Sequence, residues 1–204
     1  MTYSQFDEDK IIADLLSRIG HGERVCVDIG ARGFVNSNVA NLVVNHGWRG
    51  LLYDRGLAAF RQLVDTFGPF AGTHVPHDRC AGCGGPKSWP VVVIKDVITP
   101  KNVNALMPKA FDMLSIDIDG QDYYVWEAIK AKPRLVVIEY NPLLTGHRVM
   151  ARQDKYERDR DPNKMQSGAS EKALVHLGKS KGYRIVDKNE ANLFFVEDSH
   201  AETL

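Results

Sequence analysis

The segment FDMLSIDIDGQDYYVWEAI, residues 111–129, joins an apolar run to four Asp residues and then to a helical pattern. Residues 111–117 are typical of a buried strand, and residues 122–131 of the helix that follows it. A buried carboxylate is costly unless it is paired, hydrogen-bonded or bound to a metal. The acidic residues therefore mark the end of this strand as a candidate site, and the strand–helix order indicates an α/β fold.

The rest of the chain repeats this alternation of apolar strands with helices. The other predicted strands before the C-terminal part are residues 24–30, 50–54, 89–98 and 133–141, and the other predicted helices are residues 6–20, 36–48, 57–68 and 99–107. Strands that are apolar on both faces and alternate with helices indicate a parallel sheet covered on each side.

The C-terminal part has a different pattern. A helix at residues 167–182 is followed by strands at residues 183–188 and 192–198. So short a connection permits only an antiparallel pair. We therefore predict one domain over residues 1–204, a mostly parallel α/β sheet that ends in an antiparallel hairpin.

The composition is that of an ordinary soluble protein, with 44% hydrophobic and 25% charged residues in 204. The 26 basic and 26 acidic side chains balance, so there is no electrostatic footprint for nucleic acid or an acidic membrane. The acidic N-terminus does not resemble a signal peptide, and no apolar run could span a bilayer. Three Cys do not make a disulfide framework. We expect a cytoplasmic protein with a small-molecule partner.

Ligands of such sheets bind outside the carboxyl ends of the strands. Gly30 and Gly33 let the backbone turn sharply and approach a ligand. Asp54, which closes the second strand, is placed to accept hydrogen bonds from both hydroxyls of a ribose. The alternative is that the glycines only make a tight turn and that Asp54 caps the next helix. The candidate cofactor contacts at these strand ends are Asp28, Gly30, Ala31, Gly33, Asp54, Asp96 and Asp117.

The loop after the first strand distinguishes between nucleotides. A dinucleotide site has the pattern G-x-G-x-x-G, whereas this loop is G-x-x-G with Asp28 two residues before Gly30. A negative charge there suits a ligand that bears an ammonium group and no phosphate. S-adenosylmethionine has an amino acid end, a sulfonium charge and a ribose, so it is favoured over NAD, and no Walker loop for ATP is present.

Six segments together resemble the FkbM-like family of S-adenosylmethionine-dependent methyltransferases. They are YSQFDEDKII (3–12), VDIGARG (27–33), GWRGLLYD (47–54), residues 111–129, PRLVVIEYN (133–141) and GASEKALVHLGKSKGYRIV (168–186). The resemblance implies the Rossmann-like, seven-stranded class I fold and methyl transfer, commonly to an oxygen of a sugar or small metabolite. It also implies that the N-terminal segment with Gln5 closes over the cofactor; the alternative is a plain helix cap.

The acidic residues recur at two neighbouring strand ends. Asp117 and Asp119 point the same way after the fourth strand, as do Glu139 and Asn141 after the fifth. Oxygen ligands of this kind hold Mg²⁺. The pattern D-x-D-G-x-D-Y followed by E-Y-N is similar to metal-dependent sugar O-methyltransferases of the macrocin type, which implies a divalent cation on Asp117, Glu139 and Asn141.

Other roles remain open for these groups. Asp117 and Glu139 could act as acid or base or bind substrate, and residues 119–122 could form a turn and helix cap. A general base would be His147 or one of the carboxylates.

The segment THVPHDRCAGCGGP, residues 73–86, is a candidate zinc site. Its Cys-x-x-Cys-Gly pattern is that of a zinc knuckle, and two His precede it. The four candidate ligands are His74, His77, Cys80 and Cys83. The alternatives are a Gly-rich surface loop with two free thiols, or a pocket wall. This segment lies in an insertion at residues 68–90, and residues 143–166 form a charged loop or a lid.

The sequence therefore predicts an S-adenosylmethionine-dependent O-methyltransferase. The alternatives are a module that binds adenosylmethionine or a nucleotide without catalysis, and a zinc-stabilised interaction domain.

Overall fold

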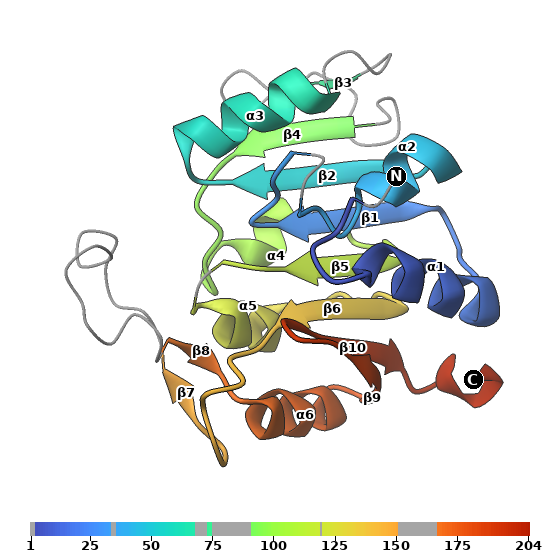
Figure 1. Cartoon of the computed structure of the whole chain (residues 1–204), viewed down its shortest axis with the longest axis vertical. Helices are drawn as coiled ribbons and strands as arrows, with labels where there is room; N and C mark the ends of the chain where they lie inside the picture. Colours follow the sequence, from blue (N-terminus) through green and yellow to red (C-terminus); the bar gives the residue numbers. More distant parts are fainter. Residues whose placement is uncertain (1–2, 34–35, 68–72, 75–90, 119, 151–166) are drawn as a thin grey trace.

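The computed structural model describes residues 3–33, 36–67, 73–74, 91–118, 120–150 and 167–204. Within these residues the core is one sheet of eight strands, in the order β3-β4-β2-β1-β5-β6-β10-β9 (Figure 1). The strands are β1 (Val25–Ile29), β2 (Arg49–Asp54), β3 (Thr73–His74), β4 (Val91–Lys95), β5 (Met113–Ile116), β6 (Leu135–Glu139), β9 (Tyr183–Lys188) and β10 (Asn192–Glu197). Seven of them were predicted, and β3 adds two residues at one edge.

The order of the strands reverses beside β1. The first half of the chain builds outward from β1 through β2 and β4, and the second half builds in the other direction through β5 and β6. All of these neighbours are parallel, so their carboxyl ends meet at one edge (Figure 1). β10 is antiparallel to both β6 and β9, which confirms the predicted hairpin. The gap between β1 and β5 at the carboxyl edge is the topological switch point, where ligands bind in such sheets.

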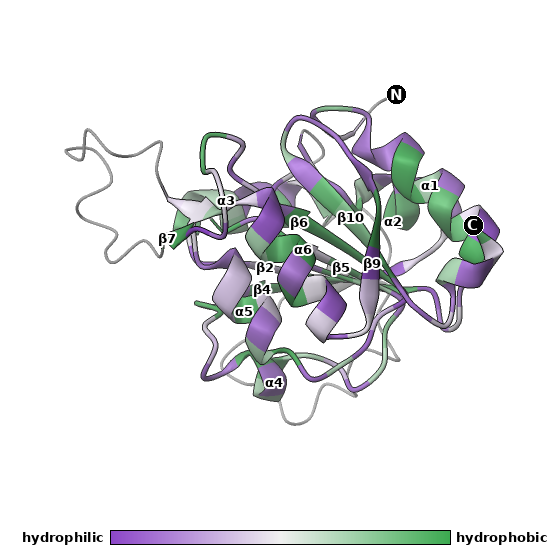
Figure 2. Cartoon of the chain, turned by 90° about the horizontal axis from the view of Figure 1, so that it is seen from below, coloured by the Kyte–Doolittle hydropathy of each residue, from purple (hydrophilic) through white to green (hydrophobic). Residues whose placement is uncertain are grey.

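Helices cover both faces of the sheet. The helices α1 (Glu8–Ile19), α2 (Ala40–His46) and α3 (Leu57–Phe67) pack on one face, and α4 (Val103–Leu106), α5 (Asp122–Ala128) and α6 (Glu171–Ser180) on the other. Successive strand residues enter opposite cores: Cys26 packs with the first set of helices and Val27 with the second. Figure 2 shows the strands as a hydrophobic layer between helices of mixed polarity.

Two short elements lie outside the main sheet. β7 (Val149–Met150) pairs with β8 (Gly168–Ala169) in a separate two-stranded sheet, and the 3-10 helix η2 (Ala201–Thr203) follows β10. Among the described helices, none has the length and apolarity that crossing a membrane requires.

One of the four Asp residues of the segment 111–129 has a structural role. Asp112 is 4% exposed, and its carboxylate accepts hydrogen bonds from the backbone N–H groups of Gly22 and Val25. The guanidinium of Arg134 lies 3.4 Å from the same carboxylate. These bonds offset the cost of burial and fix the turn that leads into β1.

The segment before α2 is hydrogen-bonded to the N-terminal segment of the chain. The hydroxyl of Ser37 receives a hydrogen bond from the N–H of Ala40, the first residue of α2, at 3.1 Å. The N–H of Ser37 itself donates to the carbonyl of Tyr3 at 3.1 Å. The stretch that precedes α1 is thereby held beside the carboxyl edge of the sheet.

Candidate functional site

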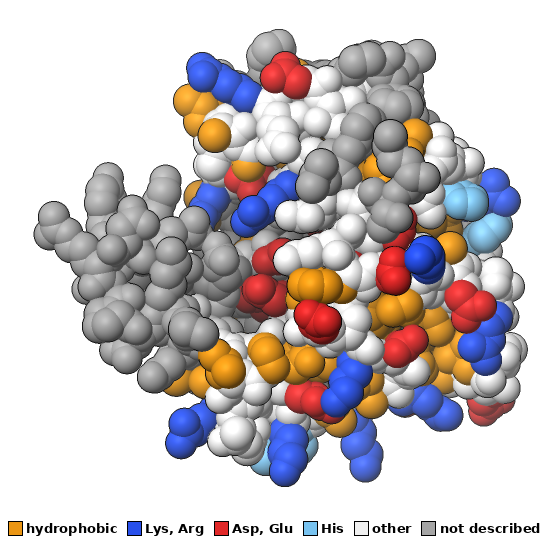
Figure 3. Space-filling view, in the orientation of Figure 1, with side chains coloured by type: hydrophobic (Ala, Val, Ile, Leu, Met, Phe, Trp, Pro, Cys, Tyr) orange, Lys and Arg blue, Asp and Glu red, His pale blue; other side chains and the backbone are white. Residues whose placement is uncertain are grey.

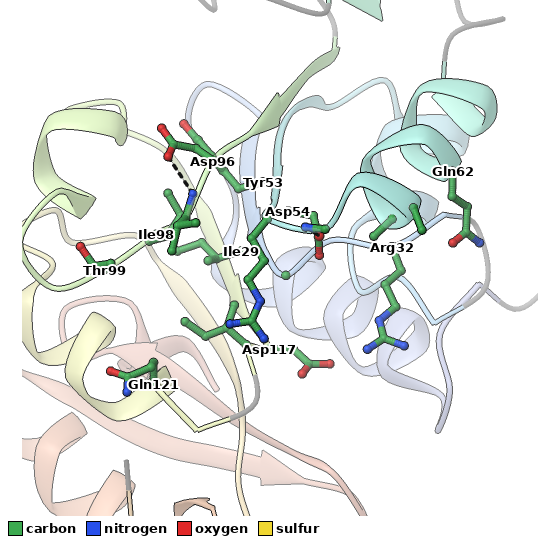
Figure 4. A pocket seen from close by; sticks show the side chains of 17 residues that line it. Ile29, Arg32, Tyr53, Asp54, Gln62, Asp96, Ile98, Thr99, Asp117 and Gln121 are labelled. Atoms are coloured by element: carbon green, nitrogen blue, oxygen red, sulfur yellow. Dashed lines mark hydrogen bonds between the residues drawn. The ribbon is translucent and has the colours of Figure 1, made fainter. Parts of the chain in front are cut away.

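A cavity of about 440 Å³ opens at the carboxyl edge, beside the switch point. Residues from the ends of β1, β2, β4 and β5 line it, among them Gly30, Asp54, Asp96, Ile98, Asp117 and Gln121 (Figure 4). Figure 3 shows acidic and basic side chains close together on this side of the molecule. The volume lies within the range of small-molecule sites, about 300–1,000 Å³.

Gly30 is required by the close approach of two strand ends. Its N–H and that of Ala31 both donate to the carbonyl of Tyr53, at 2.9 and 3.0 Å. Its φ is +90°, and a Cβ placed on it would lie 1.7 Å from the carbonyl oxygen of Asp117. Only glycine fits this position. The predicted sharp turn is present, and it brings the end of β1 against the end of β5.

Two other predicted contacts of this loop face the protein interior. A Cβ on Gly33 would lie 2.8 Å from Thr66 Oγ1 of α3, so this glycine permits close packing of the loop on the helix. Ala31 is 1% exposed and belongs to the core. Neither residue lines the cavity. Arg32, between them, does line it.

Asp54 and Asp96 stand at the rim of the cavity and also stabilise their own turns. One oxygen of Asp54 accepts from the N–H of Gly56, just before α3, so the alternative capping role is present as well. Asp96 Oδ1 accepts from the N–H of Val97 at 2.7 Å (Figure 4). A carboxylate accepts several hydrogen bonds, so a local bond leaves capacity for a ligand.

Asp28 lies behind the cavity rather than in its wall. It is 4% exposed and borders neither the larger cavity nor a smaller one beside it. Burial raises the pKa of Asp28 to about 7; a hydrogen bond with Ser115 opposes the rise, and the negative charges of Asp117 and Asp54 add to it. The amide of Asn38 donates to Ser115 Oγ at 3.2 Å, which links Asp28 to the surface of the smaller cavity.

A second, smaller cavity of about 170 Å³ adjoins the first. Asp117 and Arg32 belong to the walls of both cavities. The remaining wall is polar throughout and comprises Gln5, Glu8, Asn36, Asn38, Glu139 and Asn192. The structure thus brings together three predicted residues, Gln5, Asp117 and Glu139. Glu8, Asn36, Asn38 and Asn192 were not predicted.

The loop after β5 is held by Asp122. Its Oδ1 accepts from the N–H of Ile118 and its Oδ2 from the N–H of Gly120, both at 2.8 Å. Burial raises the pKa of Asp122 to about 6, although these two bonds lower it. The predicted turn-and-cap role therefore applies to this residue, which fixes the loop that follows Asp117. Asp119 lies outside the described residues.

Of the predicted ligands for a divalent cation, Asp117 and Glu139 share the smaller cavity and Asn141 lies apart from them. Asn141 borders neither cavity; its Oδ1 accepts from the N–H of Leu143 and its Nδ2 donates to the carbonyl of Ser167. Within the part of the chain that the structure describes, no three His, Cys, Asp or Glu side chains form a group that could hold a metal ion. The acid, base or substrate-binding role predicted for Asp117 and Glu139 stays a prediction.

His147 does not join this site. It is exposed, borders neither cavity and stacks edge-on against His176 of α6, with ring centroids 5.7 Å apart. In this arrangement it is separate from Asp117 and Glu139, so one of the carboxylates is the better candidate for a base.

The predicted zinc site and lid fall largely outside the described residues. His77, Cys80 and Cys83 are not described, and of His74 only the backbone is, in β3. Residues 151–166 of the charged segment are likewise not described. Zinc binding and a lid therefore stay predictions.

Several solved structures with a similar fold are named as methyltransferases. A SAM-dependent methyltransferase from Aquifex aeolicus matches 93% of this chain and 88% of its own at 16% identity, with a TM-score of 0.52. Magnesium protoporphyrin IX methyltransferase (ChlM) from Synechocystis PCC 6803, solved with bound SAM, matches 93% of this chain and 77% of its own at 11% identity and a TM-score of 0.52. Monomeric WbdD matches 94% of this chain at 12% identity and a TM-score of 0.51, and the chain spans 41% of its length.

No family model and no curated protein sequence matches the chain. The sheet order and these structures together define a Rossmann-like methyltransferase fold, as the sequence predicted. Membership of the FkbM-like family stays a prediction.

Proposed function

We propose that the protein transfers a methyl group from S-adenosylmethionine to a small-molecule acceptor. The observation that carries the proposal is the cavity at the switch point, which has the carboxylates of Asp54, Asp96 and Asp117 around it. S-adenosylmethionine has a sulfonium charge, an ammonium group and a ribose, and it has no phosphate. The wall also carries the guanidiniums of Arg32 and Arg55, so three carboxylates outnumber two positive groups. The net negative charge favours such a ligand and disfavours a dinucleotide with its pyrophosphate.

The donor would bind along the strand ends. Asp54, at the end of β2, would accept the ribose hydroxyls, and Val97 and Ile98 after β4 would pack against the adenine. Val97 is 51% exposed and lines the cavity, so a bound base would cover apolar surface that water now contacts. The sulfonium would then lie beside Asp117, where the two cavities meet.

The smaller cavity offers groups for the reaction itself. Asp117 and Glu139 both line it, and either carboxylate could remove a proton from an attacking hydroxyl. The acceptor oxygen would attack the methyl carbon in line with the departing sulfur, the C–S bond would break, and S-adenosylhomocysteine would leave as a neutral thioether. The resemblance of the sequence supports a sugar or another small hydroxylated molecule as the acceptor. No step of this reaction is assigned to a divalent ion, since the described residues include no group of three His, Cys, Asp or Glu side chains that could hold one.

A methyl-transfer assay tests this proposal. The protein is incubated with methyl-labelled S-adenosylmethionine and a panel of small sugars, polyols and amines, and S-adenosylhomocysteine is measured in the presence and absence of a chelator. We expect acceptor-dependent product, and a loss of product with the chelator would show that the reaction also needs a divalent ion. Binding of S-adenosylhomocysteine with no product from any acceptor would instead support a non-catalytic binding module.

A further inference from the structure

Glu8, at the start of α1, is a buried carboxylate in the wall of the smaller cavity. It is 1% exposed, and its two oxygens accept from the N–H of Phe6 at 2.7 Å and from Asn192 Nδ2 at 3.0 Å. None of the ion pairs among the described residues involves it. A buried charge held only by neutral donors is best stabilised by a cation, and the cavity beside it is where a cation could enter.

Asn192, the first residue of β10, points to the same kind of ligand independently. It is 7% exposed and lines the cavity. Its Nδ2 donates to Glu8, which fixes the orientation of the amide, since a flipped amide would set two oxygens against each other. Its Oδ1 is buried and has no hydrogen-bond partner among the described residues. A buried acceptor without a donor is unfavourable, so a ligand with N–H or O–H groups would relieve it.

The formal charges of the cavity wall distinguish between these two kinds of donor. Three carboxylates line it, those of Glu8, Asp117 and Glu139, and one guanidinium, that of Arg32. A neutral hydroxyl would satisfy Asn192 Oδ1 but would bring no positive charge to the carboxylate of Glu8. An ammonium group supplies both the charge and up to three N–H donors.

The wall is also organised in advance of binding. Asn189 Nδ2 donates to the carbonyl of Phe6 at 3.0 Å, and Ser37 N–H donates to the carbonyl of Tyr3 at 3.1 Å. These bonds tie the N-terminal segment to the β9–β10 turn and to the segment before α2. A wall already held in place costs little ordering entropy when a ligand binds.

We propose that the smaller cavity is a site for a primary ammonium group, with Glu8 and Asn192 Oδ1 as its main acceptors. The inference rests on the proposed function, which supplies two sources of an ammonium group. One is the α-ammonium of S-adenosylmethionine bound in the larger cavity, and the other is the amine of an acceptor. Both sources share the same chemistry at Glu8.

The first arm of the test concerns the donor. Calorimetric titration compares S-adenosylhomocysteine with its deaminated analogue, which keeps the carboxylate, in the wild type and in Glu8→Gln. If the donor supplies the ammonium, the wild type binds S-adenosylhomocysteine roughly 10- to 100-fold more tightly than the analogue, as expected for one charge-assisted contact. Glu8→Gln should reduce this ratio to a few-fold at most, whereas Glu190→Gln, the same change on an exposed turn residue, should preserve it.

The second arm concerns the acceptor. Ethanolamine and ethylene glycol are titrated with and without saturating S-adenosylhomocysteine. If the acceptor supplies the ammonium group, Glu8→Gln should weaken the binding of ethanolamine and leave the binding of ethylene glycol unchanged. The deaminated analogue reports folding, because a misfolded variant would lose it too. If Glu8→Gln binds the analogue normally and changes neither the ratio nor ethanolamine binding, the ammonium site is wrong. If the wild type binds no adenosyl compound, the proposed function fails, and the titration without S-adenosylhomocysteine still decides the ammonium site.

Discussion

Replacing Gly30 with Ala should abolish cofactor binding and destabilise the fold by about 4 kcal/mol, through backbone strain and overpacking together. The added Cβ would lie 1.7 Å from the carbonyl oxygen of Asp117, and that atom is backbone, which no side-chain rotation can move away. The φ of +90° adds strain for any residue with a Cβ. The ends of β1 and β5 would have to separate, and the cavity lies where they meet. Urea unfolding and titration with S-adenosylhomocysteine would measure both losses.

Gly47→Ala is the matched control for Gly30→Ala. Gly47 ends α2 with a φ of +66°, and a Cβ there would meet nothing within 4 Å. Gly47→Ala should therefore lower the free energy of unfolding by about 1 kcal/mol, the conformational cost alone, and leave ligand binding intact. Equal effects of the two substitutions would contradict the close approach of β1 and β5.

Asp28→Asn should change how stability depends on pH. The carboxyl has an ordinary pKa of 3.8 in the unfolded chain and about 7 in the folded protein. Between these values the folded state holds more protons, so the contribution of Asp28 to stability is complete below about pH 4 and falls as pH rises to about 7. The loss amounts to about 4 kcal/mol. The side chain of Asn resembles the protonated carboxyl and does not titrate, so the variant should not show this loss of stability.

Urea unfolding of both proteins from pH 4 to pH 8 would measure this effect. Asp122 has a pKa raised to about 6 and contributes a slope of the same sign, so the difference between variant and wild type isolates Asp28. The variant should gain stability relative to the wild type as pH rises to about 7, and no further above it. A difference that stays constant with pH would show that Asp28 is not buried as a titrating group.

The architecture could be predicted from the sequence because the main strands and helices each show the hydrophobic periodicity of their type. The run at residues 111–117 and its equivalents give β1, β2, β4, β5 and β6, and the short connection before Asn192 gives the hairpin. The strands β3, β7 and β8 were missed. Each has two residues and is defined by its pairing with a distant strand, which no local pattern reveals.

The candidate site was predictable where a residue sits at a strand end. Asp54 and Asp117 line the larger cavity for that reason. Asn141 also follows β6, but its amide oxygen accepts from the N–H of Leu143. His147 lies in the loop beyond it, where its ring packs against His176 of α6. Glu8 and Asn192 were missed because only tertiary contacts bring them together, through the docking of α1 and the pairing of Asn192 with Glu139.

The most direct test of the central claim is a calorimetric titration of the wild-type protein with S-adenosylmethionine, S-adenosylhomocysteine and NAD. If the acidic cavity at the switch point holds the methyl donor, both adenosyl compounds bind at one site per chain and NAD does not. Binding of NAD alone, or of none of the three, would contradict it.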